Sequence, residues 1–185
     1  AHVTKVADTC AEILSVMGYS AHETELAKIA AYLHDIGNLV NRIDHSQSGA
    51  VMAFRILDKL NMEASDIATV VSAIGNHDEG TGVPVDAVSA ALILADKSDV
   101  RRSRVRNRDK ASFDIHDRVN YAVTDAALKI NMDKKVIALN LQIDTKICSM
   151  YEYFEIFLGR MMMCRGAAEV LGATFKLTAN GSKVL

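Results

Sequence analysis

The order of apolar and polar residues predicts that the first two thirds of the chain are helical. Apolar residues recur at a spacing of three or four positions, which is the period of one face of an α-helix. Ser20 and Glu23 form a capping-box pattern before one of these segments, and Gly37 is placed to end it. We expect helices over residues 3–17, 21–34, 46–60, 65–75 and 85–99, and a shorter one over 115–123.

The pattern then changes from a helical period to a two-residue alternation. Apolar and polar residues alternate over 128–132 and 137–143, and the Asp133-Lys134-Lys135 link between these runs predicts a hairpin. A further alternating run at 174–178 precedes Asn180-Gly181, which is a strong tight-turn signal. We therefore expect a small antiparallel β-sheet in the last third of the chain.

A long helix is predicted between the hairpin and the last strand, over residues 147–171. Its apolar residues extend beyond a single stripe, and a helix that is apolar on more than one face is usually buried on both. We expect it to pack on the sheet and against either the helical part or another subunit, which leaves a homodimer open. The fold class is mainly α, with a helical domain at residues 1–122 and a strand–strand–helix–strand extension at 123–185.

Composition and charge restrict the class of protein. The chain has 185 residues, half of them hydrophobic and only one of them proline, so it is long enough for one compact core. A formal net charge of −2 argues against a nucleic-acid partner, because nucleic-acid-binding domains are usually strongly basic. Three scattered cysteines without metal-finger spacing favour a reducing compartment. No apolar stretch reaches membrane-spanning length, so we expect a soluble, cytoplasmic protein without a membrane partner.

Histidines and aspartates gather at the ends of the predicted helices, where side chains from different helices can converge. His34 and Asp35 close an apolar helix, and two adjacent polar residues are costly to bury there without partners. A divalent cation satisfies both, because imidazole nitrogen and carboxylate oxygen are common metal ligands. Asp96 follows the apolar run 91–95 and also needs a metal, an arginine or a histidine. A capped helix end is the simpler interpretation of any single residue, whereas the combination favours a shared site.

In these residues the sequence resembles the HD-domain family of metal-dependent phosphohydrolases, whose helical bundle carries the pattern His … His-Asp … Asp. The residues that match this pattern are His2, His34, Asp35 and Asp96. Members with a second metal have two further histidines before the last aspartate, where this chain has His45 and His77. The resemblance implies a mainly helical bundle and two adjoining metal sites, one from His2, His34, Asp35 and Asp96 and the other from Asp35, His45 and His77.

The remaining histidines are interpreted differently. A helix break precedes the His77-Asp78 pair, so only His77 is a predicted ligand. His116 lies in a polar segment and is predicted to be at a solvated helix start, and His22 belongs to the capping box and should be exposed.

Three positions depart from better-known branches of the family. Asp78 and Val83 stand where the cyclic-dinucleotide phosphodiesterases of this superfamily have a histidine and a tyrosine, and Asn38 stands where many two-metal members have a lysine. The arrangement is more similar to nucleotide-polyphosphate hydrolases that use two histidines. The sequence does not name one substrate.

An arginine-rich stretch runs from Lys97 to Lys110, directly after Asp96. A guanidinium presents a fork of donors that suits phosphate oxygens. Lys97, Arg101 and Arg102 are therefore candidate substrate contacts. A solvated face is the better interpretation of the rest of the stretch, which includes Arg104, Arg106 and Arg108.

The resemblance, together with these features, implies a phosphohydrolase that cleaves a nucleotide or another phosphate ester or anhydride through metal-activated water. Asp35, as a bridge between metals, and Lys97, as a neutralising charge, are the predicted catalytic residues. The ligands suit two divalent transition-metal ions and do not distinguish iron, manganese, nickel, cobalt and zinc. The alternative is a non-enzymatic, metal-containing sensor or adaptor that binds a nucleotide and uses the extension as an interaction surface. Nucleic-acid binding through the arginines ranks last.

Overall fold

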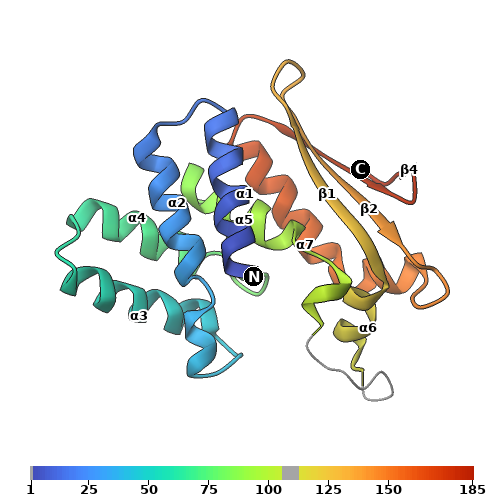
Figure 1. Cartoon of the computed structure of the whole chain (residues 1–185), viewed down its shortest axis with the longest axis horizontal. Helices are drawn as coiled ribbons and strands as arrows, with labels where there is room; N and C mark the ends of the chain where they lie inside the picture. The colour runs from blue at the N-terminus through green and yellow to red at the C-terminus, as the bar shows by residue number, and fades with distance from the viewer. Residues whose placement is uncertain (1, 106–112) are drawn as a thin grey trace.

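The helical part of the chain contains the five main helices that the apolar period predicts (Figure 1). The computed structural model describes residues 2–105 and 113–185, so Arg106 and Arg108 lie outside the described residues. Each helix begins and ends within about two residues of its predicted bounds, an ordinary uncertainty for helix ends. The helices are α1 (His2–Val16), α2 (Ala21–Leu33), α3 (His45–Lys59), α4 (Ala64–Gly75) and α5 (Ala87–Ser98).

Helix α5 is the centre of the helical part. It packs against α1, α2 and α4 on one side and against the extension on the other. All of its residues from Val88 to Ser98 are buried, so it has no solvent-facing stripe. Its last turn therefore places the polar side chains of Asp96 and Lys97 inside the protein, where each needs a charged partner.

The chain between α2 and α3 makes a close approach to α3. A short 3-10 helix, η1 (Ile36–Leu39), follows α2, and its Gly37 lies against the first turns of α3. A Cβ atom at Gly37 would lie 2.6 Å from the Ser48 Oγ and 2.6 Å from the Gly49 amide nitrogen. Only glycine fits at this distance, and the contact places Asp35 close to the start of α3.

Helix α6 (Ile115–Ala122) leads into the extension, which contains β1 (Val123–Asn131), β2 (Val136–Ile143), α7 (Met150–Val170), β3 (Thr174–Ala179) and β4 (Ser182–Lys183). The strands form one sheet in the order β1-β2-β3-β4. The predicted hairpin is confirmed, since β1 and β2 pair antiparallel around a turn at residues 132–135. The expectation of an antiparallel sheet is wrong for one pair, because β2 and β3 run parallel. The α7 crossover between them returns the chain to the same end of the sheet.

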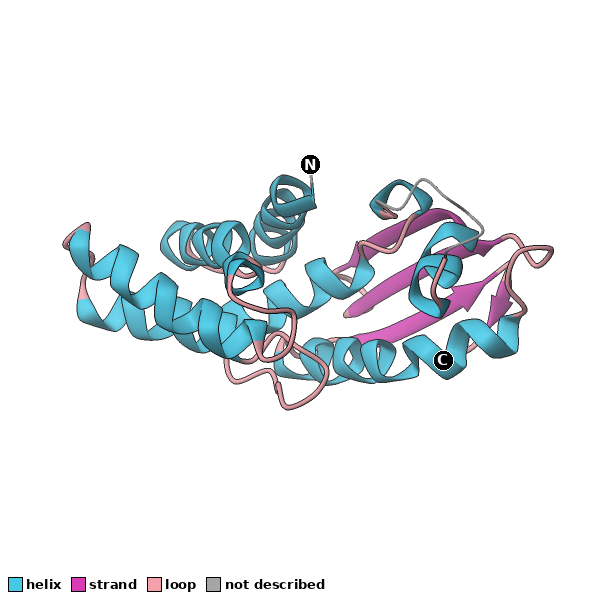
Figure 2. Cartoon of the chain, turned by 90° about the horizontal axis from the view of Figure 1, so that it is seen from below, coloured by secondary structure: helices cyan, strands magenta, loops and turns pink. Residues whose placement is uncertain are grey.

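Helix α7 joins the two parts of the chain. It contacts α5 on one side and β3 on the other, and Figure 2 shows it lying along one face of the sheet. Its buried residues Tyr153, Phe157, Met161 and Cys164 belong to the same hydrophobic cluster as the residues of α5. Two faces of this helix are thus covered within one chain, whereas its Tyr151, Leu158 and Met162 are exposed. The boundary between a domain at 1–122 and an extension at 123–185 stays a prediction. No helix in the described part of the chain is long and apolar enough to span a membrane.

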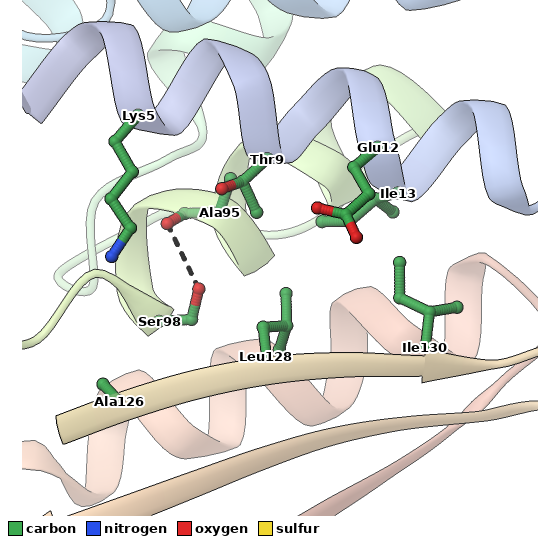
Figure 3. A pocket seen from close by; sticks show the side chains of 9 residues that line it. All are labelled: Lys5, Thr9, Glu12, Ile13, Ala95, Ser98, Ala126, Leu128 and Ile130. Carbon is green, nitrogen blue, oxygen red and sulfur yellow. Dashed lines mark hydrogen bonds between the residues drawn. The ribbon is translucent and has the colours of Figure 1, made fainter.

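A small cavity separates α1 from β1 where the sheet meets the helical part (Figure 3). Its volume is about 180 Å³, and it is lined by Leu128 and Ile130 of β1 and by Lys5, Thr9 and Glu12 of α1. This cavity explains why the inward residues of β1 are only partly buried, whereas Ile137 and Leu139, their partners on β2, are fully buried.

Candidate metal centre

The six predicted ligands come from the ends of all five main helices and meet in one place. They are His2 at the start of α1, His34 and Asp35 after α2, His45 at the start of α3, His77 after α4 and Asp96 in the last turn of α5. The three histidines His34, His45 and His77 are buried, and so is Asp96. The helix ends thus bring together residues that lie far apart in the sequence, as predicted.

One half of this ligand cluster surrounds an oxygen of Asp96. The Asp96 Oδ1 atom lies 3.2 Å from the His2 Nε2 and 3.7 Å from the His34 Nε2. The Asp35 Oδ2 atom lies 3.6 Å from the His34 Nε2 and 3.9 Å from the His2 Nε2. His2, His34 and Asp96 therefore offer three ligand atoms with the spacing of a metal site.

The other half lies on the opposite oxygen of Asp35. The Asp35 Oδ1 atom is 3.6 Å from the His45 Nε2, which in turn is 3.1 Å from the His77 Nε2. His34, Asp35 and His77 also form a group with ligand spacing. The Asp35 carboxylate therefore lies between the two halves, with one oxygen toward each, as expected of a bridging residue.

The three buried histidines all direct the same ring atom into the cluster. The Nδ1–H groups of His34 and His77 donate to the backbone oxygens of Ala31 and Ile74, at 2.7 and 2.6 Å. The Nδ1–H of His45 donates to the Arg42 oxygen at 3.1 Å. A ring that donates from Nδ1 has its Nε2 lone pair free, which is the usual second-sphere arrangement of metal-binding histidines.

The hydrogen-bonding state of the side-chain atoms in this cluster is compatible with a bound divalent cation. The Nε2 atoms of His2 and His34 are buried and have no hydrogen-bond partner among the described residues. An unsatisfied buried nitrogen is costly, and these two converge with two carboxylates and with the His45 and His77 Nε2 atoms, which lie 3.1 Å from each other. Mixed imidazole and carboxylate ligands suit a divalent transition metal. A metal would therefore satisfy atoms that the protein itself leaves without partners.

Asp99 is a residue of the site that sequence reasoning missed. Its buried carboxylate accepts a hydrogen bond from the His2 Nδ1 at 2.7 Å and ion pairs from Lys5 and Arg101 at 2.9 and 2.8 Å. Burial raises the pKa of Asp99, but its bonds to His2 and Lys5 outweigh this effect and lower the pKa well below the ordinary range. Asp99 thus orients His2 as the backbone oxygens orient the other histidines. Its position three residues after Asp96, at the end of the same helix, is the signal that could have revealed it.

Asp96 is held ionised by a chain of opposite charges. Its Oδ2 atom pairs with the Lys97 Nζ at 2.9 Å, and Lys97 also pairs with the Glu79 carboxylate at 3.2 Å. Burial alone would raise the pKa of Asp96, but the Lys97 ammonium and the adjacent imidazoles of His2 and His34 place it well below its usual value. The pKa of Lys97 is raised because Asp96 and Glu79 outweigh its burial. Lys97 uses one oxygen of Asp96 and leaves the other for the ligand cluster.

The electrostatics of the histidines differ across the cluster. Burial lowers the pKa of His2 and of His34, but the Asp96 carboxylate outweighs it and leaves both above the ordinary value. Burial, assisted by the nearby Lys97, lowers the pKa of His77 to about 4. His77 is therefore neutral near pH 7 and presents a lone pair, as a ligand must.

Asn38 forms a hydrogen bond with the Asp35 carboxylate. Its Nδ2 donates to the Asp35 Oδ1 at 2.9 Å, and it lines the cavity above the cluster. The asparagine that departs from many two-metal members of the family thus contacts the bridging carboxylate directly.

The predicted substrate contacts of the arginine-rich stretch do not all reach the cluster. Arg101 lines the cavity above it, but Arg102 donates to the Tyr121 backbone oxygen at 2.7 Å and stacks over the Tyr121 ring. Lys97 is buried against two carboxylates and is not among the described residues that line the adjoining cavities. Arg104, which we interpreted as part of a solvated face, donates to the Asp99 backbone oxygen at 3.1 Å and lies 3.9 Å from Asp96.

Two open cavities adjoin the cluster and share Arg104. The ligand cavity has a volume of about 680 Å³ and is lined by residues that include His2, Asp35, Asn38 and Arg101. The second, which we call the extension cleft, has a volume of about 740 Å³ and runs from Arg104 to α6 and α7. Both are of the size that small-molecule sites have, between about 300 and 1,000 Å³.

The two histidines that were kept out of the site lie away from the ligand cluster. His22 is mostly exposed and pairs with Asp66 at 2.9 Å, and His116 is exposed in the first turn of α6. Both observations agree with a solvated position for these side chains.

A comparison with protein families identifies the family to which the chain is similar. A family model described as the HD domain matches residues 1–117 of the chain. A search of curated proteins finds no match. The matched residues include all six predicted ligands, and β1 to β4 and α7 lie beyond them.

Proposed function

The chain belongs to the HD-domain family, and on that premise we propose that it is a metal-dependent phosphohydrolase of a small phosphorylated substrate. The substrate class is a nucleotide or another phosphate ester or anhydride. The observation that carries the proposal is the bridging position of Asp35, whose two oxygens face His34 and His45 at 3.6 Å each. A single carboxylate between two groups of histidines is the arrangement that two-metal hydrolytic sites need.

We propose two divalent ions as cofactors, one held by His2, His34, Asp35 and Asp96 and one by Asp35, His45 and His77. When bound, such ions supply an activated water at neutral pH and neutralise charge on the phosphoryl oxygens. The residue types suit iron, manganese, nickel, cobalt or zinc equally.

The chain's own residues then orient the reaction. Asp35 is open to the ligand cavity, with its side chain 31% exposed, so a phosphoryl group can approach it from that side. Arg101 and Arg104 line the same cavity and can donate to phosphate oxygens. Lys97 acts from behind the cluster, where it directs one Asp96 oxygen toward the histidines. We therefore assign Lys97 a positioning role and leave Arg102 out of the substrate site.

Phosphate release tests this proposal. The full chain, reconstituted with each of the five metals in turn, is incubated with nucleoside mono-, di- and triphosphates and with simple phosphate esters. We expect turnover of at least one class and a loss of about 10²–10³-fold in kcat for Asp35→Asn, the range for removal of one electrostatic group from an active site. Asp58→Asn, a change of an exposed aspartate on α3, serves as the matched control.

Two outcomes would contradict the proposal. Equal activity in Asp35→Asn and Asp58→Asn would place catalysis elsewhere. Tight nucleotide binding by the metal-loaded protein without phosphate release would favour the alternative function, a metal-containing sensor or adaptor.

A further inference from the structure

The extension cleft brings arginines from three parts of the chain to one hollow beside the ligand cluster. Arg42 comes from the loop before α3, Arg104 follows α5 and Arg160 comes from the middle of α7. The cleft lies where the helical part faces the extension, and one wall of it is formed by α7, which the family match does not reach. The extension therefore contributes directly to the surroundings of the predicted metal site.

Arg42 is a cation without an acidic partner. Its Nη1 lies 3.5 Å from the His45 Nε2, and no carboxylate of the described residues forms an ion pair with it. A guanidinium that has no carboxylate partner attracts an anion. Its position suits an anionic group that lies next to the second half of the ligand cluster.

Arg160 is held in place by the protein before any ligand binds. Its guanidinium pairs with the Glu79 carboxylate and stacks over the Phe157 ring, 4.4 Å from the ring centre. Its side chain is only 17% exposed, so it has few other conformations available. A fixed guanidinium loses little conformational freedom when it binds an oxyanion, which makes it an effective phosphate ligand.

Of the acidic residues that line the cleft, Glu79 is paired by cations, whereas Asp114 and Asp117 belong to the start of α6. Lys97 and Arg160 both form ion pairs with the Glu79 carboxylate. Asp114 accepts a hydrogen bond from the Asp117 amide and caps α6. On the cluster side of the cleft, the Arg42 guanidinium is the charge for which the described residues provide no carboxylate partner.

Arg104 connects the two cavities. It lines both the ligand cavity and the extension cleft. A ligand that reaches from Asp35 in the first cavity into the second would therefore pass Arg104.

We propose that the extension cleft is an anion-binding site that holds a second phosphate group of the substrate, with Arg42, Arg104 and Arg160 as its contacts. This inference rests on the proposed hydrolysis at the ligand cluster, where the reacting phosphate lies. It assigns the extension a role in specificity, because α7 supplies a contact that selects substrates with two or more phosphates over simple monoesters.

Binding of a non-hydrolysable diphosphate tests the inference separately from catalysis. Methylenediphosphonate and inorganic phosphate are titrated calorimetrically into the full chain, both metal-loaded and after chelation. We expect the diphosphonate to bind at least about tenfold more tightly than phosphate, and Arg42→Gln to remove most of this preference, since hydrogen bonds to charged groups are worth about that factor. Arg160→Gln should have the same effect, and the chelated protein should retain part of the preference.

Matched controls isolate the cleft from general charge effects. Arg55→Gln removes an exposed cation from α3, and Arg165→Gln removes an exposed cation from α7 that pairs with Glu169 in the same helix. Neither should alter the preference. Arg42 is exposed, so its variant is expected to fold, and circular dichroism confirms this before titration.

The binding and hydrolysis experiments distinguish failure of the anion-site inference from failure of the proposed function. Equal diphosphonate affinity in the wild type, Arg42→Gln and Arg160→Gln would overturn the anion site even if phosphate release depends on Asp35. A diphosphonate preference that depends on Arg42 in a protein that hydrolyses nothing would support the anion site and reject the catalytic proposal.

Discussion

At the scale of single residues, the candidate metal centre depends on which atom of each side chain is already bonded. Backbone oxygens take the Nδ1–H of His34 and His77, and Lys97 takes one oxygen of Asp96. The ring nitrogens and the carboxylate oxygen that these bonds leave free point into the ligand cluster. The groups that bond the outer atom of each ligand are therefore as important to the metal centre as the ligands, because they fix the direction of the atom that would coordinate the metal.

Asp99 should influence metal affinity without being a ligand. In Asp99→Asn, the carboxylate that orients His2 and makes its ring more basic is lost, and we expect metal affinity to fall by about 10–100-fold, the usual effect of such outer partners. Competition with a chelator of known affinity measures this change. Asp8→Asn, at an exposed position of α1, is the control. An unchanged dissociation constant in Asp99→Asn would show that His2 is not a ligand or does not need orienting.

Gly37 should tolerate no side chain. An added Cβ would overlap the first turns of α3, so Gly37→Ala should push η1 away from α3 and separate Asp35 from His45. We expect loss of metal binding together with a destabilisation of about 1–3 kcal/mol, typical of overpacking. In Gly166→Ala, in α7, the new methyl group would lie 3.8 Å from the Pro84 side chain, an ordinary contact distance, and no loss is expected. Equal metal binding and equal melting temperatures in the two variants would contradict the close approach.

At the scale of secondary-structure elements, capping and packing explain most of what the sequence predicted. The apolar period located all five main helices, and the Ser20–Glu23 capping box is present as expected. Ligands at helix ends could be inferred because an apolar run leads directly into a polar pair such as His34-Asp35. The parallel pairing of β2 with β3 could not, since alternation along a strand does not reveal the direction of its neighbour.

Long-range pairs were the part of the site that the sequence could not reveal. Arg160 reaches Glu79 across 81 positions of the chain only because α7 packs against α5. Arg102 lies in the same stretch as Arg101 but turns toward Tyr121 instead of the cavity. Tertiary contacts decide the direction in which each arginine side chain points, and the residue type alone does not predict it.

Helix α7 should depend on its N-terminal cap. Ser149 and Glu152 form a capping box that satisfies backbone amides at the start of this helix. Ser149→Ala should lower the free energy of unfolding by about 1 kcal/mol, the usual value for such a cap. Urea denaturation followed by circular dichroism measures the difference, with Ser15→Ala at an exposed position of α1 as control. A loss no larger than that of the control would mean that α7 is held by packing alone.

At the scale of the whole molecule, one hydrophobic cluster extends from the helical part into the extension. Its members include Cys10 of α1 and Cys164 of α7, and both thiols are fully buried. A shared core of this kind favours a single cooperative unfolding transition.

Thiol labelling should report this cooperativity. Burial raises the pKa of Cys164 to about 12, so its thiol should not react with iodoacetamide in the folded protein near pH 8. We expect Cys10 and Cys164 to become reactive at the same urea concentration, as followed by mass spectrometry of the labelled peptides. Reaction of Cys164 at a clearly lower concentration would instead show that the extension unfolds on its own, as a separate domain at 123–185 would.

The measurement that bears most directly on the candidate metal centre is the metal content of the purified, untagged full chain by plasma mass spectrometry. The wild type is compared with Asp35→Ala and with Asp58→Ala, the exposed control on α3. The bridging position of Asp35 predicts about two equivalents of a divalent transition metal in the wild type and the control, and less than about one in Asp35→Ala. A wild type that holds no metal and cannot be loaded, or an Asp35→Ala variant with undiminished metal, would contradict the assignment of this cluster as the metal centre.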